Sequence, residues 1–427
     1  MSNEDCTIRN RWIDISASPP SYLMFSCKRF LLYLFTAGFL FFLQSCATLP
    51  ERRPVPEEAV EIAQIPGIPV ARWWGDKMPQ VFVNALNNFS QPDYEIRFPE
   101  IINRSHHYLA ISGGSSEGAF GAGFLAGWTA SGQRPKFTMV TGVSVGALIA
   151  PMAFLGPDYD AKLKEVFTSI STQDILSERS WLEILTGDSL YDSKPLQSLI
   201  TKILDENMAQ AIIAEHKKGR RLLIGTTNLD ANRPVIWNIG NILISGHPKA
   251  LELARKILLA SASIPGIFPP VYIEVQANGQ TYDEIHIDGG AASQVFVYPA
   301  EIKWKDITKK FGVKGKPNVY VIRNSQIHPD WEAVEPNDLV NIFDQSITSL
   351  IRTQGLGDLN TIYLLSQRDH NDYHLTYIPT DFKMKPKEFF DTKYMQALFS
   401  LGYDLAKSGN SWKKAPPGFQ SIEADRK

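Results

Sequence analysis

Cysteine is scarce in this sequence, and its placement excludes a core held by disulfides. The 427-residue chain has three cysteines, Cys6, Cys27 and Cys46, all near the N-terminus. No intrachain disulfide can form beyond Cys46, so the stability of the remaining chain must come from core packing. With 44% hydrophobic residues, the chain has enough apolar material for one large domain or two ordinary ones.

An excess of charge of either sign is also missing. Lys and Arg number 43, Asp and Glu number 45, and the formal net charge is −2. Without a basic field, the chain is not expected to bind nucleic acid. The basic segment 215–221 (EHKKGRR) is expected to be a solvated face, with contact to an anionic lipid surface as the alternative.

The apolar run near the N-terminus is short. Phe30–Leu43 holds 14 residues without a charge, which is too short to span a bilayer comfortably but suits the hydrophobic part of a signal peptide. Lys28 and Arg29 supply the preceding positive charge. The run ends in LQSC, which resembles the bacterial lipobox, so cleavage before Cys46 and lipid attachment to it are expected. An uncleaved membrane anchor or a buried helix is the alternative.

These features define the expected processing of the chain. Residues 1–45 are the predicted signal peptide, with Met24 as the true start. Ala47 stands where many inner-membrane lipoproteins carry an aspartate, so the predicted location is the bacterial cell envelope, with the outer membrane favoured over the inner. The Pro- and Glu-rich residues 46–65 are expected to form a lipidated tether.

The remaining chain is expected to form a main domain with a part on either side. Residues 66–106 form an N-terminal extension packed on this domain; for its Trp73 and Trp74, contact with a membrane is the alternative. The main domain is predicted over 107–300, and a C-terminal part over 301–427 is expected to pack on it.

From residue 107 onward the apolar pattern is typical of an α/β fold. Strands are predicted over 107–112 and 136–142. A glycine-rich turn leads from the first into a helix, and a second helix starts at Ser144. This order is typical of a parallel sheet. Further strands are predicted over 220–230, 233–240, 284–290 and 317–325, and helices over 248–264 and within 339–367.

Ser144 lies in the sequence Gly142-Val143-Ser144-Val145-Gly146, which fits G-x-S-x-G. A sharp strand-to-helix turn leaves no room for side chains beside a nucleophile, so glycines flank it and its hydroxyl stays accessible. The helix N-terminus also favours negative charge near the serine. The motif therefore favours a nucleophilic Ser144, with an N-cap serine at a glycine packing site as the alternative.

A glycine-rich loop follows the preceding strand. Gly113, Gly114 and Ser115 lead into a helix, and small residues there leave backbone N–H groups that can hold an oxyanion or a phosphate. The dinucleotide-binding pattern G-x-G-x-x-G fails, because Ser115 stands at its third position. An oxyanion loop is therefore favoured, and a plain glycine-rich turn is the alternative.

The third motif is HIDGG, at the end of the strand predicted over 284–290. Asp288 is followed there by Gly289 and Gly290; taken singly, Asp-Gly is an ordinary turn signal. In this order the three motifs resemble the patatin-like phospholipase family, whose pattern is a G-G-G-x-R-G-like oxyanion loop, then G-x-S-x-G, then D-G-A/G. The resemblance covers roughly 107–300 and extends to TTNLDANRPVIW and ASASIPGIFPPV.

The resemblance implies a three-layer α/β/α fold with a mostly parallel central sheet, and a lipid acyl hydrolase that uses no metal or cofactor. It implies a dyad in which Ser144 is the nucleophile and Asp288 its base, with N–H groups around Gly113, Gly114 and Ser115 as the oxyanion hole. A carboxylate in a partly dry site can have a raised pKa and accept the hydroxyl proton on the way to an acyl-enzyme. The expected partners are a lipid or other carboxylic ester and, through the lipid anchor, the membrane.

The sequence departs from the family pattern at two positions. Ser115 replaces the third glycine, and Glu117 stands where the pattern is basic. One alternative is a Ser-His-Asp enzyme of the α/β-hydrolase fold, which would need His328, His370 or His374 as its base. Another is a catalytically inactive envelope scaffold or lipid-binding protein.

Two further groups of polar residues have ordinary structural explanations. His286, two residues before Asp288, could tune the aspartate or act as a base, but a structural histidine is expected. The segment 368–374 (RDHNDYH) could hold a metal, but a solvated turn is expected because a strand-like stretch overlaps its end.

Overall fold

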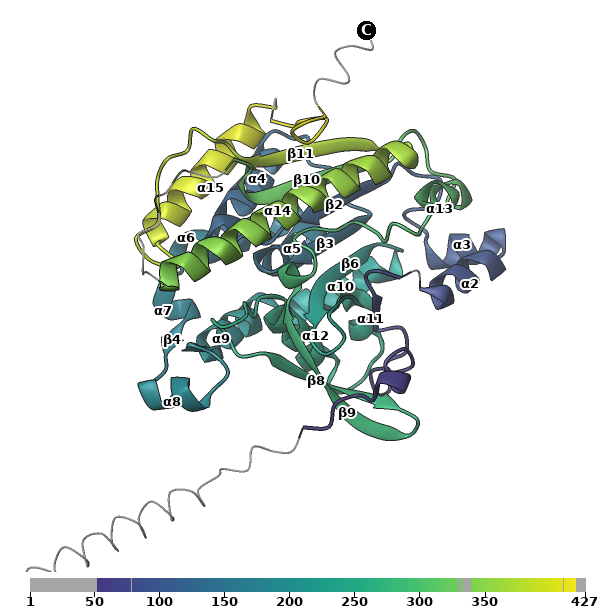
Figure 1. Ribbon diagram of the computed structural model, residues 1–427. Helices are drawn as coiled ribbons and strands as arrows, with labels where there is room; N and C mark the ends of the chain where they lie inside the picture. The colour runs from purple at the N-terminus through teal and green to yellow at the C-terminus, as the bar shows by residue number, and fades with distance from the viewer. Residues whose placement is uncertain are drawn as a thin grey trace, which may run out of the picture. The chain divides into compact units, whose positions relative to one another are not determined.

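The computed structural model describes residues 52–77, 79–328, 331, 333, 339–409 and 411–419. The predicted signal peptide and the lipidation site at Cys46 lie outside these residues. The described chain from Arg53 onward belongs to one contact unit, to which everything below refers (Figure 1).

A nine-stranded sheet organises this unit. Its strand order is β1-β7-β6-β3-β2-β10-β11, and β9 pairs with both β6 and β8. The neighbours β6, β3, β2, β10 and β11 run parallel, whereas β1, β7, β8 and β9 join by antiparallel pairings. The strands are β1 Arg72–Trp74, β2 His107–Ile111, β3 Met139–Val143, β6 Arg221–Asn228, β7 Arg233–Asn238, β8 Val271–Ala277, β9 Gln280–Asp288, β10 Asn318–Gln326 and β11 Asp372–Ile378. A separate two-stranded sheet joins β4 (Ser177–Glu178) to β5 (Tyr191–Asp192).

Helices cover both faces of the large sheet, as Figure 1 shows for α14 on the face towards the viewer. Leu109 and Ile111 of β2 belong to the core that also contains α4, α5 and α12, whereas Tyr108 and Ala110 belong to the core that contains residues of α13 and α14. The helices are α2 Gln80–Asn88, α3 Gln91–Arg97, α4 Gly118–Ala130, α5 Val145–Leu155, α6 Asp160–Ser169, α7 Thr172–Ile175, α8 Trp181–Thr186, α9 Lys194–Ile203, α10 Glu206–Lys217, α11 Ile239–Ile244, α12 Ala250–Ser261, α13 Trp304–Lys310, α14 Leu339–Arg368 and α15 Thr392–Lys407. The predicted three-layer fold with a mostly parallel centre is confirmed.

Most of the predicted elements are present. The strands expected over 107–112 and 136–142 are β2 and β3, and the expected pair of strands after residue 220 is the antiparallel pair β6 and β7. β8 was not predicted, although its residues alternate between buried and exposed along its whole length. β9, its partner, starts at Gln280, earlier than the expected strand over 284–290. The predicted limits of the parts before and after the main domain stay predictions.

The strand β1 joins the segment before the domain to the sheet. It pairs with β7, and its Arg72 side chain donates a hydrogen bond of 2.7 Å to Glu284 of β9, which is buried. Burial would raise the pKa of Glu284, but the Arg72 guanidinium and His286 lower it to about 2. Trp73 and Trp74 are half-buried and pack against the cores on opposite faces of the sheet.

Within the described residues, none of the helices combines the length and the apolar character needed to cross a membrane.

Candidate active site

The turn between β3 and α5 consists of Ser144 alone. Its backbone has φ 55° and ψ −127°, a conformation that a residue with a side chain rarely adopts. A Cβ on Gly146 would lie 2.3 Å from the Ile111 carbonyl oxygen, and a Cβ on Gly142 would lie 2.4 Å from the Gly146 carbonyl oxygen. Both glycines of the motif are therefore required by close backbone approach around the serine.

Asp288 ends β9 beside the same turn, opposite Thr226 of β6, the strand next to β3. Its carboxyl accepts a hydrogen bond of 2.7 Å from the Gly290 N–H. Burial raises the pKa of Asp288 to about 6, although hydrogen bonds with the Ser144 side chain and the Gly290 N–H lower it. A Cβ on Gly289 would lie 2.5 Å from a backbone carbonyl oxygen of β6. The structure thus brings the predicted nucleophile and base together.

The loop after β2 lies against Ser144. A Cβ on Gly113 would stand 3.1 Å from the Ser144 Cβ, and Ser115 lines the same pocket as Ser144. Gly114 and Ser115 have φ of 147° and 49°, so the backbone turns sharply. The Gly113 N–H donates to the Gln294 carbonyl oxygen (3.1 Å), so it is not the free oxyanion donor that we expected. The N–H groups of Gly114 and Ser115 have no hydrogen-bond partner within the described part of the chain.

Asn324, near the end of β10, forms hydrogen bonds with residues on both sides of this loop. Its side-chain amide donates to the Ser112 carbonyl oxygen (2.9 Å) and its side-chain oxygen accepts from the Gly121 N–H (3.0 Å). A Cβ on Gly114 would lie 2.0 Å from the Asn324 carbonyl oxygen, so the two backbones pass in close contact. Sequence reasoning missed Asn324, whose one signal is a polar residue in an apolar strand.

Gln294 connects the glycine loop to the turn that holds the acid. Its backbone carbonyl accepts from the Gly113 N–H, and its side-chain amide donates to the Gly290 carbonyl oxygen (2.8 Å). Its own N–H donates to the Asp358 carboxyl of α14 (2.6 Å), which also accepts from the Ser293 hydroxyl. Burial raises the pKa of Asp358, while these hydrogen bonds lower it. No motif in the sequence marks this support from α14.

Ser261, the last residue of α12, supports the serine turn. Its hydroxyl accepts a hydrogen bond of 3.0 Å from the Ser144 N–H and donates one of 2.7 Å to the Gly225 carbonyl oxygen. Ser261 is fully buried and lies in the ASASIPGIFPPV segment. The part of the resemblance carried by this segment therefore has a physical basis, since it fixes the backbone of the candidate nucleophile.

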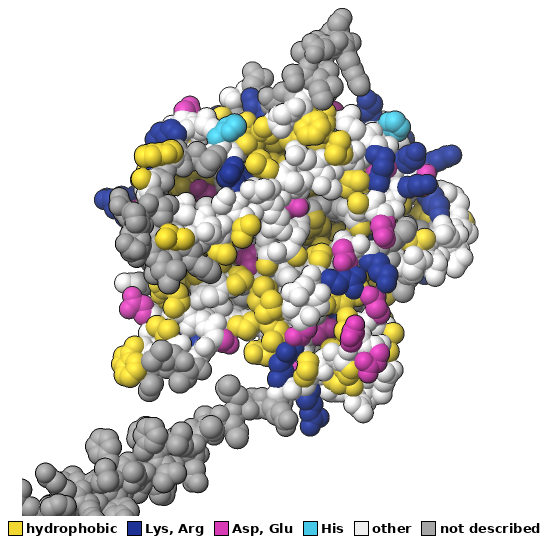
Figure 2. All heavy atoms as spheres, in the orientation of Figure 1, with side chains coloured by type: hydrophobic (Ala, Val, Ile, Leu, Met, Phe, Trp, Pro, Cys, Tyr) yellow, Lys and Arg dark blue, Asp and Glu magenta, His cyan; other side chains and the backbone are white. Residues whose placement is uncertain are grey.

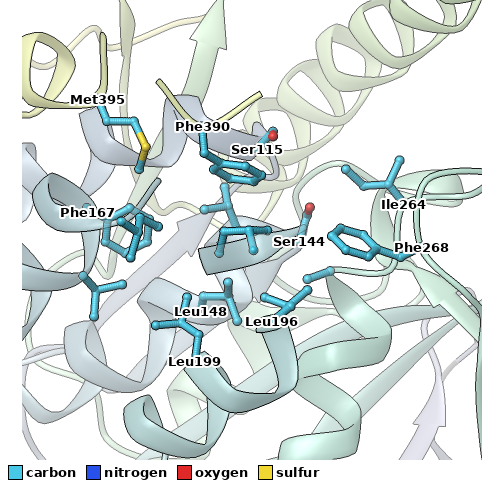
Figure 3. A pocket seen from close by; sticks show the side chains of 15 residues that line it. Ser115, Ser144, Leu148, Phe167, Leu196, Leu199, Ile264, Phe268, Phe390 and Met395 are labelled. Carbon is cyan, nitrogen blue, oxygen red and sulfur yellow. The ribbon is translucent and has the colours of Figure 1, made fainter. Parts of the chain in front are cut away.

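An apolar pocket opens at Ser144. Figure 3 shows the Ser144 and Ser115 hydroxyls between the side chains of Phe390 and of Ile264 and Phe268, and the rest of the wall is hydrophobic. The wall residues come from α5, α6, α7, α9, α15, Ile170 and the loops around 262–268 and 390, and include Leu148, Phe167, Leu196, Phe268, Phe390 and Met395. The free volume is about 40 Å³. A narrow apolar space suits a thin acyl chain better than a bulky polar group.

Glu117, at the position where the family pattern is basic, turns its carboxyl towards two residues of other elements. The Tyr394 hydroxyl donates to it (3.2 Å), and the Arg323 guanidinium attracts it. Burial raises the pKa of Glu117 to about 7, although Tyr394 and Arg323 lower it. Near neutral pH the carboxyl therefore carries a partial negative charge close to the glycine loop.

His286 has structural partners. Its ring nitrogens lie 3.0 Å from the Thr226 hydroxyl and 3.1 Å from the Glu284 carboxyl, and it is fully buried. Burial lowers the pKa of His286, although Glu284 raises it. In the described residues no hydrogen bond joins it to Asp288.

Of the three histidines considered as alternative bases, His370 and His374 lie away from Ser144, and none of the three has a hydrogen bond to Ser144 or Asp288 within the described residues. His370 precedes β11 and His374 lies in its first half, whereas Ser144 follows the C-terminal end of β3. Because these strands run parallel, the two histidines are at the opposite end of the sheet. His328 is exposed after β10. Across the described ranges, no group of three or more side chains of the metal-binding types is arranged to hold an ion.

The fold and site define an α/β domain with a candidate nucleophile on a strand-to-helix turn. Residues 109–301 match the family model described as Patatin-like phospholipase. The matched segment contains Ser144, Asp288 and the loop at Gly113, Gly114 and Ser115.

Two solved structures are similar to the chain. One is VipD from Legionella pneumophila, with 12% identity and a TM-score of 0.36, covering 71% of this chain and 66% of that chain. The other is the type III effector protein ExoU, with 12% identity and a TM-score of 0.30, covering 75% of this chain and 59% of that chain. The chain therefore spans less than two thirds of the length of either. No curated protein matches the sequence.

Proposed function

We propose that this protein is a lipid-anchored serine acyl hydrolase that cleaves carboxylic esters of lipids through Ser144 and Asp288. The observation that carries the proposal is the buried Asp288 carboxyl, with a pKa raised to about 6, hydrogen-bonded to the Ser144 side chain at an apolar pocket. A carboxyl with such a pKa is ionised at neutral pH and is still basic enough to accept a hydroxyl proton in the transition state.

The reaction follows from these positions. The Ser144 oxygen attacks the ester carbonyl carbon while its proton passes to Asp288, and the carbonyl oxygen becomes an oxyanion. The N–H groups of Gly114 and Ser115 donate to this oxyanion; losing one such donor typically costs about 10²–10³ in rate. The bond to the alcohol then breaks, and Asp288 returns the proton to it. Water, deprotonated by Asp288, then attacks the acyl-enzyme; the bond to the Ser144 oxygen breaks, Asp288 returns the proton to that oxygen, and the acid leaves.

The lining of the pocket indicates which part of the substrate it accepts. Its hydrophobic wall suits the acyl chain, while the head group would lie towards the glycine loop. There the partial charge of Glu117 disfavours an anionic head group. We therefore favour a lipid ester with a neutral or zwitterionic head group.

The membrane anchor and the location are part of the same proposal. They rest on the lipobox-like LQSC sequence, with Cys46 as the acylated residue and Ala47 favouring the outer membrane of the bacterial envelope. Growth with a labelled fatty acid should label the protein. Label retained in Cys46→Ser would contradict the anchor without affecting the proposed chemistry.

The dyad is tested with a soluble chromogenic short-chain ester and a fluorophosphonate probe. Ser144→Ala and Asp288→Asn should each lower ester hydrolysis at least about 10³-fold, with an unchanged melting profile for Ser144→Ala, and the probe should label Ser144 alone. The matched control Asp306→Asn, at an exposed position in α13, should retain full activity. Full activity in Asp288→Asn would refute the dyad, and an unlabelled, inactive but folded protein would favour the scaffold alternative.

A further inference from the structure

Exposed apolar side chains gather on two segments beside the pocket. One is the hairpin 177–192, which contains β4, α8 and β5, and the other is the segment 381–391 before α15. The side chains, with their exposed fractions, are Trp181 (72%), Ile184 (38%), Leu190 (48%), Met384 (43%) and Phe389 (47%). We refer to these five residues as the apolar rim. Figure 2 shows hydrophobic side chains on the surface at the place of α8. Single exposed apolar residues are ordinary, but a neighbouring group of them marks an interaction surface.

The two segments touch each other. The ring of Phe389 packs edge-on against the ring of Tyr191, with centroids 6.1 Å apart. The adjacent Phe390 N–H donates to the Thr172 hydroxyl at the start of α7 (3.1 Å), which precedes the hairpin. Two parts of the chain that are distant in sequence therefore meet at Phe389, and both contribute exposed apolar side chains there.

The same segments form or support the pocket wall on their inner side. Phe390, next to the exposed Phe389, lines the pocket. The N–H groups of Leu190 and Tyr191 donate to the carbonyl oxygens of Gly266 and Ile267, at 2.9 and 3.0 Å, and this loop carries the pocket residues Ile264 and Phe268. An apolar surface outside thus continues into an apolar cavity inside that ends at the candidate nucleophile.

The charges around the rim do not favour a strongly charged partner. Lys383, Lys385 and Lys387 are exposed, but acidic side chains accompany them in both segments, and Arg179 of the hairpin pairs with Asp188 at 3.4 Å. Attraction to an anionic surface is therefore small, and burial of apolar area is the available driving force. An exposed Trp with polar neighbours is typical of residues that lie at a membrane–water interface.

We propose that the apolar rim is an interfacial surface that inserts into a lipid bilayer and places the pocket mouth on it. A lipid acyl chain then passes from the bilayer into the pocket without crossing water. This inference rests on the proposed function, because a lipid substrate is what makes the bilayer the expected partner. A protein partner is the competing occupant, and the experiment separates the two.

Depth of insertion is measured directly in reconstituted vesicles. The three native cysteines of the full chain are replaced by Cys6→Ser, Cys27→Ser and Cys46→Ser. A single new cysteine, which carries an environment-sensitive fluorophore, is then introduced by Trp181→Cys. Ile96→Cys is the control. Ile96 is 77% exposed on α3, which lies far from α8 in Figure 1. Vesicles are phosphatidylcholine with spin-labelled acyl chains as quenchers.

We expect at least twofold quenching at position 181, independent of salt, and little at position 96. Both labels report from a chain in which Cys46→Ser has removed the proposed lipidation site, so a lipid anchor affects neither label. Equal quenching at the two positions would overturn the inference. A label at 181 that stays unquenched in vesicles but becomes shielded from water in a cell extract would also overturn it, because that result identifies a protein partner instead.

Kinetics provides an independent test that distinguishes this inference from the proposed function. The double variant Trp181→Ser, Phe389→Ser should hydrolyse a vesicle-embedded ester at least tenfold more slowly than the unmodified chain, and a soluble short-chain ester within twofold of its rate. Ile96→Ser should match the unmodified chain on both. If the unmodified chain hydrolyses neither ester, the proposed function fails; if it hydrolyses both and the double variant is equally active on vesicles, only the apolar rim fails.

Discussion

Two neighbouring strand-to-helix connections at one edge of the sheet contribute to the site by different physical means. The connection from β3 to α5 is the single residue Ser144, held by glycines in contact with adjacent backbone. The connection from β2 to α4 is longer, and the Asn324 side chain of β10 and the Gln294 backbone carbonyl of the loop after β9 hold it through hydrogen bonds. The first fixes a hydroxyl by steric fit, and the second fixes N–H groups through polar partners. The first should therefore fail when atoms are added, and the second when a hydrogen bond is removed.

Adding one methyl group at the serine turn should have the largest effect. In Gly146→Ala the new Cβ would meet the Ile111 and Ser112 carbonyl oxygens at 2.3 and 2.7 Å, and neither backbone can move without disturbing β2. We expect a loss of about 2–4 kcal/mol in the free energy of unfolding, measured in urea, together with loss of activity. The control Gly357→Ala, in an open position of α14, should be neutral or stabilising by up to about 1 kcal/mol. Equal stability of the two variants would refute the steric account.

Removing a polar partner of the glycine loop should lower the rate more than it changes substrate binding. Asn324→Ala deletes the hydrogen bonds to Ser112 and Gly121, so the N–H groups at Gly114 and Ser115 lose their fixed direction. Because the bound ester carries no oxyanion and the charge develops only as Ser144 attacks, we expect kcat on a soluble ester to fall about 10–100-fold with KM nearly unchanged. A variant that raises KM and leaves kcat intact would show that Asn324 does not position the loop.

The acid links activity and stability to pH. Asp288 must be ionised to accept a proton, so kcat/KM should rise with pH through about 6 and then level off. The pKa of Asp288 in the folded protein lies above its ordinary value of 3.8. The free energy of unfolding is therefore highest when the carboxyl is protonated, and it falls as pH rises from 3.8 through about 6. Above pH 7, the buried charge of Asp288 lowers the free energy of unfolding by about 3 kcal/mol.

Comparison with Asp288→Asn measures how much the buried charge of Asp288 lowers the free energy of unfolding. The variant should be more stable than the unmodified chain at pH 8, and the difference should shrink at pH 5, in urea unfolding at both values. A difference that does not depend on pH would contradict the raised pKa of Asp288, whatever the activity of the variant.

The smallest expected effect is at Glu117. Burial raises its pKa to about 7, so its carboxyl is mostly ionised at pH 8 and mostly neutral at pH 6. Glu117→Gln removes that charge near the oxyanion loop and should raise kcat about two- to fivefold at pH 8, equivalent to ~0.4–1 kcal/mol, with little change at pH 6. Glu165→Gln, exposed on α6, is the control and should show no change at either pH. A decrease at pH 8 would show that the carboxyl assists the reaction.

The parts of the site that sequence reasoning found are those with local physical causes. The spacing around Ser144 follows from one sharp turn, and β2 and β3 are short apolar runs because both faces of the central sheet are covered. β8 was not predicted, although its alternation between buried and exposed residues is a readable strand signal.

The supporting residues could not be found in this way. Asn324 bonds to groups more than 200 positions earlier in the chain, and the Asp358 carboxyl reaches Gln294 from a helix on one face of the sheet. No local sequence pattern marks either residue, because their hydrogen-bond partners are distant in sequence and come close only in the folded chain. The same reason explains why Gly113 was expected to be a free donor: its partner, the Gln294 carbonyl oxygen, comes from beyond the acid motif.

The ion pair between Arg72 and Glu284 sets a lower limit on how far the chain can be shortened while keeping an intact site. A fragment that starts after Trp74 would leave the Glu284 carboxylate inside the protein without its cation, on the strand that ends in Asp288. Such a fragment would contain every residue of the three motifs, yet we expect the unpaired charge to destabilise the strand that carries Asp288. A shortened chain that keeps the site intact should therefore begin before β1, well upstream of the segment that the family model covers.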